Sequence, residues 1–192
     1  MQISARCWMS KLKHTAQVSK AVHEVREASG LPWLFNDGTV SGDLPDINVW
    51  LALAVEEHPH HAAAKQYWDN VQAQPAGERN LWFCRVTMLG LVRLLSQPKV
   101  MGLGVLNLMQ AMALYQQFRA VASVDLLIEP KQCDSVLQGL VVAHSTNQPL
   151  PTRLWTDAYL AALAQSSGAR LVSFDQDFTR FDKTNQLILS SV

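Results

Sequence analysis

Three aspartates stand where a short apolar run gives way to a helix-like pattern: Asp46 in LPDINVWLAL, Asp157 in LWTDAYLAALA and Asp175 in LVSFDQDF. In an α/β domain, the carboxyl ends of parallel strands border the crevice in which ligands bind. Carboxylates that converge there make an all-oxygen site, which suits Mg²⁺ or Mn²⁺ better than softer metals. We therefore predict that these three residues are the metal-binding and catalytic residues of a metal-dependent phosphodiesterase.

Each aspartate also has a purely structural interpretation. Asp46 would cap a helix beginning near Val49, Asp157 would interact with the dipole of its own helix, and Asp175 would cap the turn that follows it. A charge inside an apolar strand is costly unless it is paired or bound to a metal, which favours a functional role for Asp46. Because strand-end carboxylates recur in this chain, we expect the three to form one site.

Four further polar residues are predicted to support the site: Asn48, Thr87, Arg93 and Asp177. Asn48 would orient a carboxylate or a water, or else form a turn. Thr87 is a candidate N-cap of a helix through Leu95 and a hydrogen-bonding group behind the metal ligands. Arg93 would neutralise a carboxylate or a phosphate, or else extend into solvent.

A histidine cluster and four tryptophans could have functional roles, but we interpret both as structural. The HPHH segment at residues 58–61 opens a helix without a further ligand at recognisable spacing, so we expect solvated histidines and no zinc site. Tryptophans can stack on nucleic-acid bases, but Trp50, Trp68, Trp82 and Trp155 lie in apolar patterns. We therefore predict that these four belong to the core.

The bulk composition is that of a globular protein. The 192 residues are 48% hydrophobic and 17% charged, and the 16 basic and 16 acidic residues balance. This balance argues against a broadly basic nucleic-acid surface, but it permits a local basic rim. The three cysteines lack zinc-site or disulfide spacing, and the apolar stretch Val49–Val55 is too short to span a bilayer. We predict a cytoplasmic protein with no membrane association.

The chain divides into an extension and a domain. Residues 1–43 are mostly polar and end in the turn-rich NDGTVSGD, and we interpret them as an N-terminal extension that is either poorly ordered or the product of an upstream start assignment. Residues 44–192 alternate strand-like runs with helical patterns. The predicted strands lie in LPDINV, LWFCRV, ASVDLLIEP, RLVSF and NQLILSSV. This order predicts an α/β domain with a mostly parallel sheet covered on both faces.

Three segments carry a family resemblance: LPDINVWLALAVEEHPHHAAAKQYW, LWFCRVTMLGLVRLLSQP and TDAYLAALAQSSGARLVSFDQDF. Over residues 44–192 they resemble the VapC-type toxins of the PIN-domain ribonuclease family. The resemblance implies a three-layer α/β/α sandwich and a Mg²⁺- or Mn²⁺-dependent endoribonuclease. Such a toxin cleaves structured RNA (tRNA or rRNA) to inhibit translation, is silenced by a cognate antitoxin, and forms a homodimer.

The resemblance assigns the acidic positions and reveals one departure. Asp46, Asp157 and Asp175 match the first, third and fourth family acids, whereas the second, usually a glutamate, falls on Gly90 in GLVR. The loss of one carboxylate weakens the case for a second metal. A subgroup with the pattern T-x-L-G-hydrophobic-x-R resembles this chain at that position, so we keep the enzyme interpretation.

The departure leaves alternatives open. Glu56, Glu57 or Asp177 would have to replace the missing carboxylate, or the chain is a catalytically weak or inactive PIN-like module that binds RNA or protein. A haloacid-type phosphatase is a further class, but it requires a DxD motif. The DIN at residues 46–48 offers only one carboxylate.

Overall fold

A computed structural model describes residues 40–75, 79–145 and 149–190. Its five strands form one sheet in the order β3-β2-β1-β4-β5, and all neighbouring pairs are parallel. The strands are β1 (Gly42–Pro45), β2 (Asn80–Phe83), β3 (Val124–Leu126), β4 (Arg170–Ser173) and β5 (Gln186–Ile188). The helices are α2 (Ile47–Ala54), α3 (His61–Gln72), α4 (Arg85–Leu95), α5 (Pro98–Met101), α6 (Leu108–Arg119), α7 (Cys133–His144) and α8 (Trp155–Ser167), with short 3-10 helices η1 (Gly102–Gly104), η2 (Thr152–Leu154) and η3 (Gln176–Arg180).

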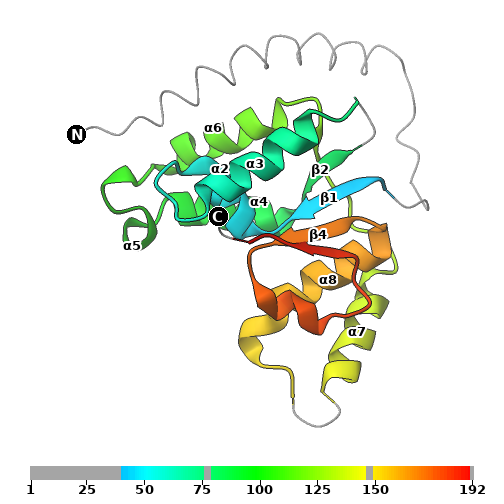
Figure 1. The fold of residues 1–192 in the computed structure, drawn as a ribbon. Helices are drawn as coiled ribbons and strands as arrows, with labels where there is room; N and C mark the ends of the chain where they lie inside the picture. Colours follow the sequence, from blue (N-terminus) through cyan, green and yellow to red (C-terminus); the bar gives the residue numbers. More distant parts are fainter. Residues whose placement is uncertain (1–39, 76–78, 146–148, 191–192) are drawn as a thin grey trace.

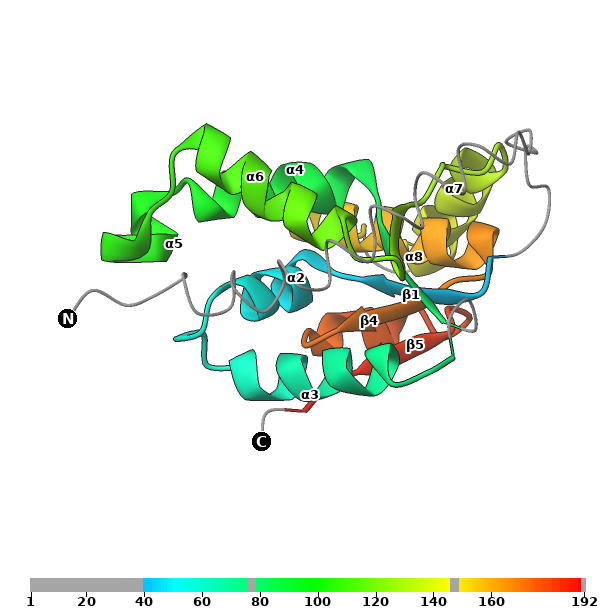
Figure 2. The ribbon, with the colours of Figure 1, turned by 90° about the horizontal axis from the view of Figure 1, so that it is seen from above.

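Helices cover both faces of the sheet, which confirms the predicted three-layer α/β/α sandwich (Figure 1). Helices α2, α3, α4 and α6 form one layer, in which α3 lies on one side of α2 and α4 with α6 on the other (Figure 2). Helices α7 and α8 form the second layer. Successive side chains of a strand point to opposite faces of the sheet, so each helical layer has its own core. Phe83 of β2 packs against the layer of α2, α3, α4 and α6. Leu44 of β1 and Leu171 of β4 pack against the layer of α7 and α8.

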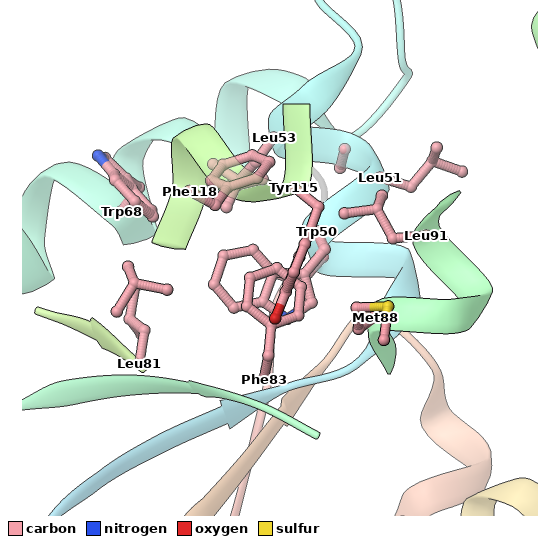
Figure 3. Close-up of a cluster of buried hydrophobic side chains, with 14 of the residues drawn as sticks. Trp50, Leu51, Leu53, Trp68, Leu81, Phe83, Met88, Leu91, Tyr115 and Phe118 are labelled. Atoms are coloured by element: carbon pink, nitrogen blue, oxygen red, sulfur yellow. The ribbon is translucent and has the colours of Figure 1, made fainter. Parts of the chain in front are cut away.

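The larger core is built around Trp50 (Figure 3). Its ring stacks on Phe83 with the centroids 3.8 Å apart, and Trp68 and Phe118 approach it edge-on at 6.5 and 5.2 Å. Such aromatic pairs add to the stabilisation from apolar burial. Trp50 and Trp68 are therefore core residues as predicted, whereas the prediction for Trp155 is wrong, because its side chain is 56% exposed.

Several predicted element boundaries shift because side chains cap the helices. The predicted strand LPDINV ends at Pro45, since Asp46 is the N-cap of α2, and Asn48 is therefore a helical residue. The N-cap of α4 is Cys84, and Thr87 is the third residue of that helix. The Thr87 hydroxyl accepts from the Cys84 N–H at 3.0 Å and completes a reciprocal capping box. The prediction of Thr87 as the N-cap is thus wrong by one turn.

The path of the chain creates a topological switch point at β1. From β1 the chain proceeds outward through β2 to β3, with its connecting helices in the first layer. It then returns through α7 and α8 in the second layer to β4, which pairs with the other side of β1. Ligand crevices of open α/β sheets form at such a point, outside the carboxyl ends of the strands. The crevice is therefore expected beside the ends of β1 and β4.

The first strand begins two residues before the predicted domain boundary at residue 44. Residues 1–39 of the predicted extension lie outside the described part of the chain. Gly42 has a φ of +135°, and a Cβ there would lie 2.2 Å from the Asn80 carbonyl oxygen of β2. Only glycine permits this close approach of the two central strands.

Asp43 forms a buried charged network at the amino end of the sheet. Its carboxylate is 1% exposed, accepts two hydrogen bonds from the Arg170 guanidinium at 2.9 and 2.8 Å, and accepts a third from the Tyr67 hydroxyl at 2.8 Å. The network ties β1 to β4 and α3. Burial and the neighbouring Asp43 carboxylate raise the pKa of Tyr67, so its hydroxyl remains a donor.

We expect Arg170→Met to lower the free energy of unfolding by about 2–3 kcal/mol, because it leaves a buried carboxylate without its cation. Tyr67→Phe removes one hydrogen bond and should cost about 1 kcal/mol. Urea unfolding at pH 7 measures both values. Equal stabilities of Arg170→Met and the wild type would show that the network contributes nothing to the fold.

Candidate active site

Asp46 lies at the carboxyl end of β1, beside the switch point. Its backbone N–H donates to the Val172 carbonyl of β4 at 2.8 Å. Its Oδ1 accepts from the Ile47 N–H at 2.6 Å, which caps α2, and its Oδ2 accepts from the Ser173 hydroxyl at 3.1 Å. The side chain is 7% exposed. Asp46 is therefore both a helix cap and a buried carboxylate, so its structural interpretation and its predicted functional role do not exclude each other.

Ser173, at the end of β4, is a site residue that the sequence analysis did not predict. Its hydroxyl donates to Asp46 and accepts from the Asn48 amide at 2.9 Å and from the Asp175 backbone N–H at 2.9 Å. The Asn48 carbonyl oxygen in turn accepts from the Phe174 N–H at 3.3 Å. Asn48 thus binds Ser173 and the Phe174 backbone from a helix, and its supporting role in the site stays a prediction. The sequence feature that could have identified Ser173 is its position as a polar residue near the end of the apolar run LVSF.

The other two predicted acids come from different elements at the same edge of the sheet. Asp157 lies in the first turn of α8 and is half-buried. Asp175 follows β4 and caps η3, accepting from the Asp177 N–H at 2.8 Å. Because α8 leads into β4, which runs parallel to β1, the amino terminus of α8 faces the carboxyl end of the sheet.

The electrostatics of the three aspartates are coupled. The pKa of Asp46 is raised from 3.8 to about 6, mainly by burial and in part by the charges of Asp157 and Asp175, while the hydrogen bonds from Ile47 and Ser173 oppose the rise. The pKa of Asp157 is likewise raised to about 6, mainly by burial, with the charges of Asp175 and Asp177 contributing to the rise and that of Arg153 opposing it. The tertiary structure therefore brings the predicted carboxylates within electrostatic reach of one another.

The donor set fits a hard divalent cation. Within the described residues, no three His, Cys, Asp or Glu side chains are grouped closely enough to hold an ion by themselves. Mg²⁺, however, retains several waters and is commonly bound through only one or two carboxylates. In the same part of the chain, Asp46 and Asp157 have no salt-bridge partner. A cation with carboxylate and water ligands would relieve their mutual repulsion.

The remaining predicted supporting residues are Thr87, Arg93 and Asp177, and no hydrogen bond or ion pair among the described residues joins their side chains to Asp46 or Asp157. The Asp177 carboxylate pairs with Arg153 and with Arg180 at 3.1 Å, and Arg153 lowers its pKa most. The Thr87 hydroxyl is used in the cap of α4. Arg93 is exposed on α4, and among the described residues it makes no ion pair with a carboxylate. We therefore retain Asp177 as a rim residue and assign Thr87 to the fold.

Two further expectations concern residues near α2. Glu56 and Glu57 are exposed in the turn after α2, and neither is among the main causes of the raised pKa of Asp46. The histidines are half-buried, not solvated as expected. The His61 Nδ1 lies 2.7 Å from the Ala52 carbonyl oxygen, and the His60 ring stacks on Phe174 with the centroids 4.5 Å apart. His60 therefore packs beside the strand-end segment that carries Asp175.

Comparison with known proteins places the chain in a family. Residues 44–184 match the PIN domain family. The chain is 35% identical over 142 residues to Ribonuclease VapC41 of Mycobacterium tuberculosis, which covers 72% of this chain and 92% of that relative. It is 30% identical over 132 residues to Ribonuclease VapC38 of the same species, covering 69% and 84%. The chain therefore belongs to the PIN-domain family, and within it to the VapC type.

Solved structures of the same type share the fold. VapBC2 from Rickettsia felis, crystallised with a DNA fragment from its promoter, matches with a TM-score of 0.55 at 15% identity, covering 77% of this chain and 98% of that one. VapBC-1 from nontypeable Haemophilus influenzae matches with a TM-score of 0.54 at 17% identity, covering 76% and 96%. None of the helices in residues 40–75, 79–145 and 149–190 combines the length and the apolar character needed to cross a bilayer.

Proposed function

We propose that this chain is the toxin of a type II toxin–antitoxin system and acts as a Mg²⁺-dependent endoribonuclease, with Mn²⁺ as a substitute. The observation that carries the proposal is the set of coupled carboxylates Asp46, Asp157 and Asp175 beside the switch point of a parallel sheet. The chain's similarity to proteins named ribonucleases supports the choice of RNA as the substrate.

The proposed mechanism is hydrolysis of a phosphodiester. A divalent cation, when bound, supplies an activated water and stabilises the charge that builds on the scissile phosphate. Asp46, Asp157 and Asp175 would hold the cation. The Ser173 hydroxyl fixes the Asp46 carboxylate by its 3.1 Å hydrogen bond, and Asn48 fixes Ser173 in turn. Without a cation, the three carboxylates repel the RNA backbone.

The surface beside the carboxylates suits RNA. Arg153 and Arg180 are 63% and 51% exposed at their side chains, and both pair with Asp177 next to Asp175. Guanidinium groups bind phosphates well, so these two residues would hold the RNA backbone at the rim of the acidic site. Trp155 begins the helix that carries Asp157 and is 56% exposed, which leaves its ring available for stacking on an unpaired base. Structured RNA with single-stranded loops, such as tRNA or rRNA, offers both features.

We expect the full-length protein to cut total tRNA or rRNA at discrete positions with Mg²⁺ or Mn²⁺, and to lose all cutting in EDTA. Activity should be lost because the carboxylates without a cation repel the RNA backbone. It should return when excess Mg²⁺ is added back. Gel analysis of end-labelled RNA measures the cuts. Cleavage that persists in EDTA would contradict a metal-dependent mechanism.

A second candidate function follows from Gly90, which stands where the family usually carries a glutamate. In this alternative the chain binds RNA or protein but does not cleave. Retained Mn²⁺ binding by a folded protein that leaves every RNA intact would support the alternative.

The proposal includes two protein partners, a cognate antitoxin and a second copy of this chain. Large apolar side chains are exposed along α4, η1 and α6. These are Leu89, Leu103, Leu108 and Met109, with exposures of 62%, 108%, 68% and 83%. Exposed apolar residues concentrated in one segment are typical of a protein interface. The solved VapBC structures from Rickettsia felis and Haemophilus influenzae, which share the fold of this chain, support an antitoxin partner. We place the protein in the cytoplasm, where its RNA substrates are.

A further inference from the structure

Asp177 joins two arginines that come from different elements beside the acidic site. Its Oδ2 accepts from Nη1 of Arg153, which lies in η2 just before α8. Its Oδ1 accepts from Nε of Arg180, the last residue of η3, at 3.1 Å. The Asp177 backbone N–H donates to Asp175 Oδ1 at 2.8 Å. These contacts link the segment that leads to Asp157 with the turn that Asp175 caps.

The arginine–aspartate cluster, formed by Arg153, Asp177 and Arg180, keeps one positive charge, because two guanidiniums face one carboxylate. Within residues 40–75, 79–145 and 149–190, neither arginine forms an ion pair with a second carboxylate. Each guanidinium has further N–H donors beside the one that it gives to Asp177. The charges of Asp177 and Arg153 both act on the pKa of Asp157. The cluster can therefore accept one more anion within electrostatic reach of the acidic site.

The carboxylate of Asp177 orders the two guanidiniums before a ligand arrives. An arginine side chain has considerable rotamer freedom, and fixing it during binding costs free energy. The side chains of Arg153 and Arg180 are 63% and 51% exposed, whereas that of Asp177 is 23% exposed between them. Two guanidiniums attached to one carboxylate lie near each other, so their remaining donors can share a single phosphate.

We propose that the arginine–aspartate cluster binds one phosphate of the RNA backbone next to the scissile phosphate, and that Asp177 is the positioning residue that holds both arginines for it. Without Asp177 the arginines would have to be ordered by the RNA itself. This inference rests on the proposed function for RNA as the ligand. The pairing of the three side chains is independent of that proposal.

Binding of an end-labelled single-stranded RNA by the full chain tests the shared phosphate. Fluorescence anisotropy in Ca²⁺, which takes the same oxygen ligands as Mg²⁺, gives the Kd at several salt concentrations, and gels check that the RNA stays intact. Arg153→Gln and Arg180→Gln should each weaken binding about tenfold, because either change leaves a neutral pair. In each variant, and in the double variant, the slope of log K against log salt should fall by about 0.7, the value for one phosphate.

Two further results would contradict a shared phosphate. A fall of about 1.4 in the slope of the double variant would show that the arginines bind two separate phosphates. Full recovery of binding by Arg153→Lys would show that a positive charge suffices without the planar guanidinium, which is needed to share the phosphate.

Asp177→Asn tests the positioning role through the sign of its effect. Loss of a negative charge near the RNA would by itself tighten binding. We expect Asp177→Asn instead to weaken binding about fivefold, because ordering two arginines costs more than one screened surface charge. Asp182→Asn is the matched control, since Asp182 is exposed two residues after Arg180 and forms no ion pair in the described part of the chain. It should not weaken binding. Tighter binding by Asp177→Asn would overturn the positioning role.

Single methylphosphonate linkages, which carry no charge, locate the phosphate. One such linkage next to the cleavage position should weaken binding by the wild type about tenfold and leave the Kd of Arg153→Gln unchanged. Equal effects of that linkage on both proteins would overturn the proposed contact.

The outcomes separate this inference from the proposed function. A protein that cuts RNA but binds it equally well without Arg153 and Arg180 would overturn the phosphate site and leave the nuclease intact. A protein whose RNA affinity depends on the arginine–aspartate cluster, but which cuts no RNA with Mg²⁺ or Mn²⁺, would overturn the proposed nuclease and support the phosphate site.

Discussion

Asp46→Asn is expected to lower RNA cleavage by more than about 100-fold while the protein stays folded. Asparagine is a good N-cap, so its side-chain oxygen can still accept from the Ile47 N–H and begin α2. The amide lacks the negative charge that a cation requires, and it replaces the most buried of the three acids. Single-turnover cleavage at saturating Mg²⁺, with circular dichroism on the same samples, measures the loss and the fold.

Two variants calibrate this result. Asp69→Asn changes an exposed aspartate on α3 that pairs with Lys65, so it removes a carboxylate from outside the site and should leave cleavage unchanged. Ser173→Ala removes the hydrogen bond to Asp46 Oδ2 but no proposed ligand, so we expect a smaller loss of about tenfold. Cleavage by Asp46→Asn at the wild-type rate would remove Asp46 from the mechanism.

The second large effect is expected in the pH dependence of the metal-free protein. The pKa values of Asp46 and Asp157 are raised from 3.8 to about 6, with burial as the main cause. Between pH 3.8 and about pH 6 the folded state therefore binds more protons than the unfolded state. Its stability therefore falls as the pH rises through about 6. Asp46, the more buried of the two, should account for up to about 3 kcal/mol between pH 4 and pH 8.

A divalent cation should reverse this trend. It binds the deprotonated carboxylates, so its stabilisation is present above pH 6 and is lost as the pH falls below it. The measurement is the Tm from pH 4.5 to 8.5 in EDTA and in Mn²⁺. We expect the two curves to converge at low pH and to diverge above pH 6. Asp46→Asn should flatten the EDTA curve and narrow the divergence. Parallel curves over the whole range would show that the cation does not bind these carboxylates.

The sequence by itself predicted the architecture. Apolar runs alternating with helical patterns imply strands buried on both faces, and therefore a parallel sheet between two helical layers. The alternation also placed Asp46, Asp157 and Asp175 near element ends, where their role as a site follows from the rule for open sheets. These inferences depend on the periodicity of neighbouring residues, which can be seen without knowing what lies across the fold.

The tertiary structure decided which side chains meet. Ser173 contacts Asp46 across 127 positions of sequence because β1 and β4 are adjacent and in register, and no local pattern predicts that register. Arg93 and Trp155 stand in apolar patterns, yet both are exposed, since the faces of α4 and α8 are set by their packing partners. Gly90 looked like a missing carboxylate in the sequence. Only the tertiary structure shows that it lies where α4 approaches α2, against the side chain of Ile47.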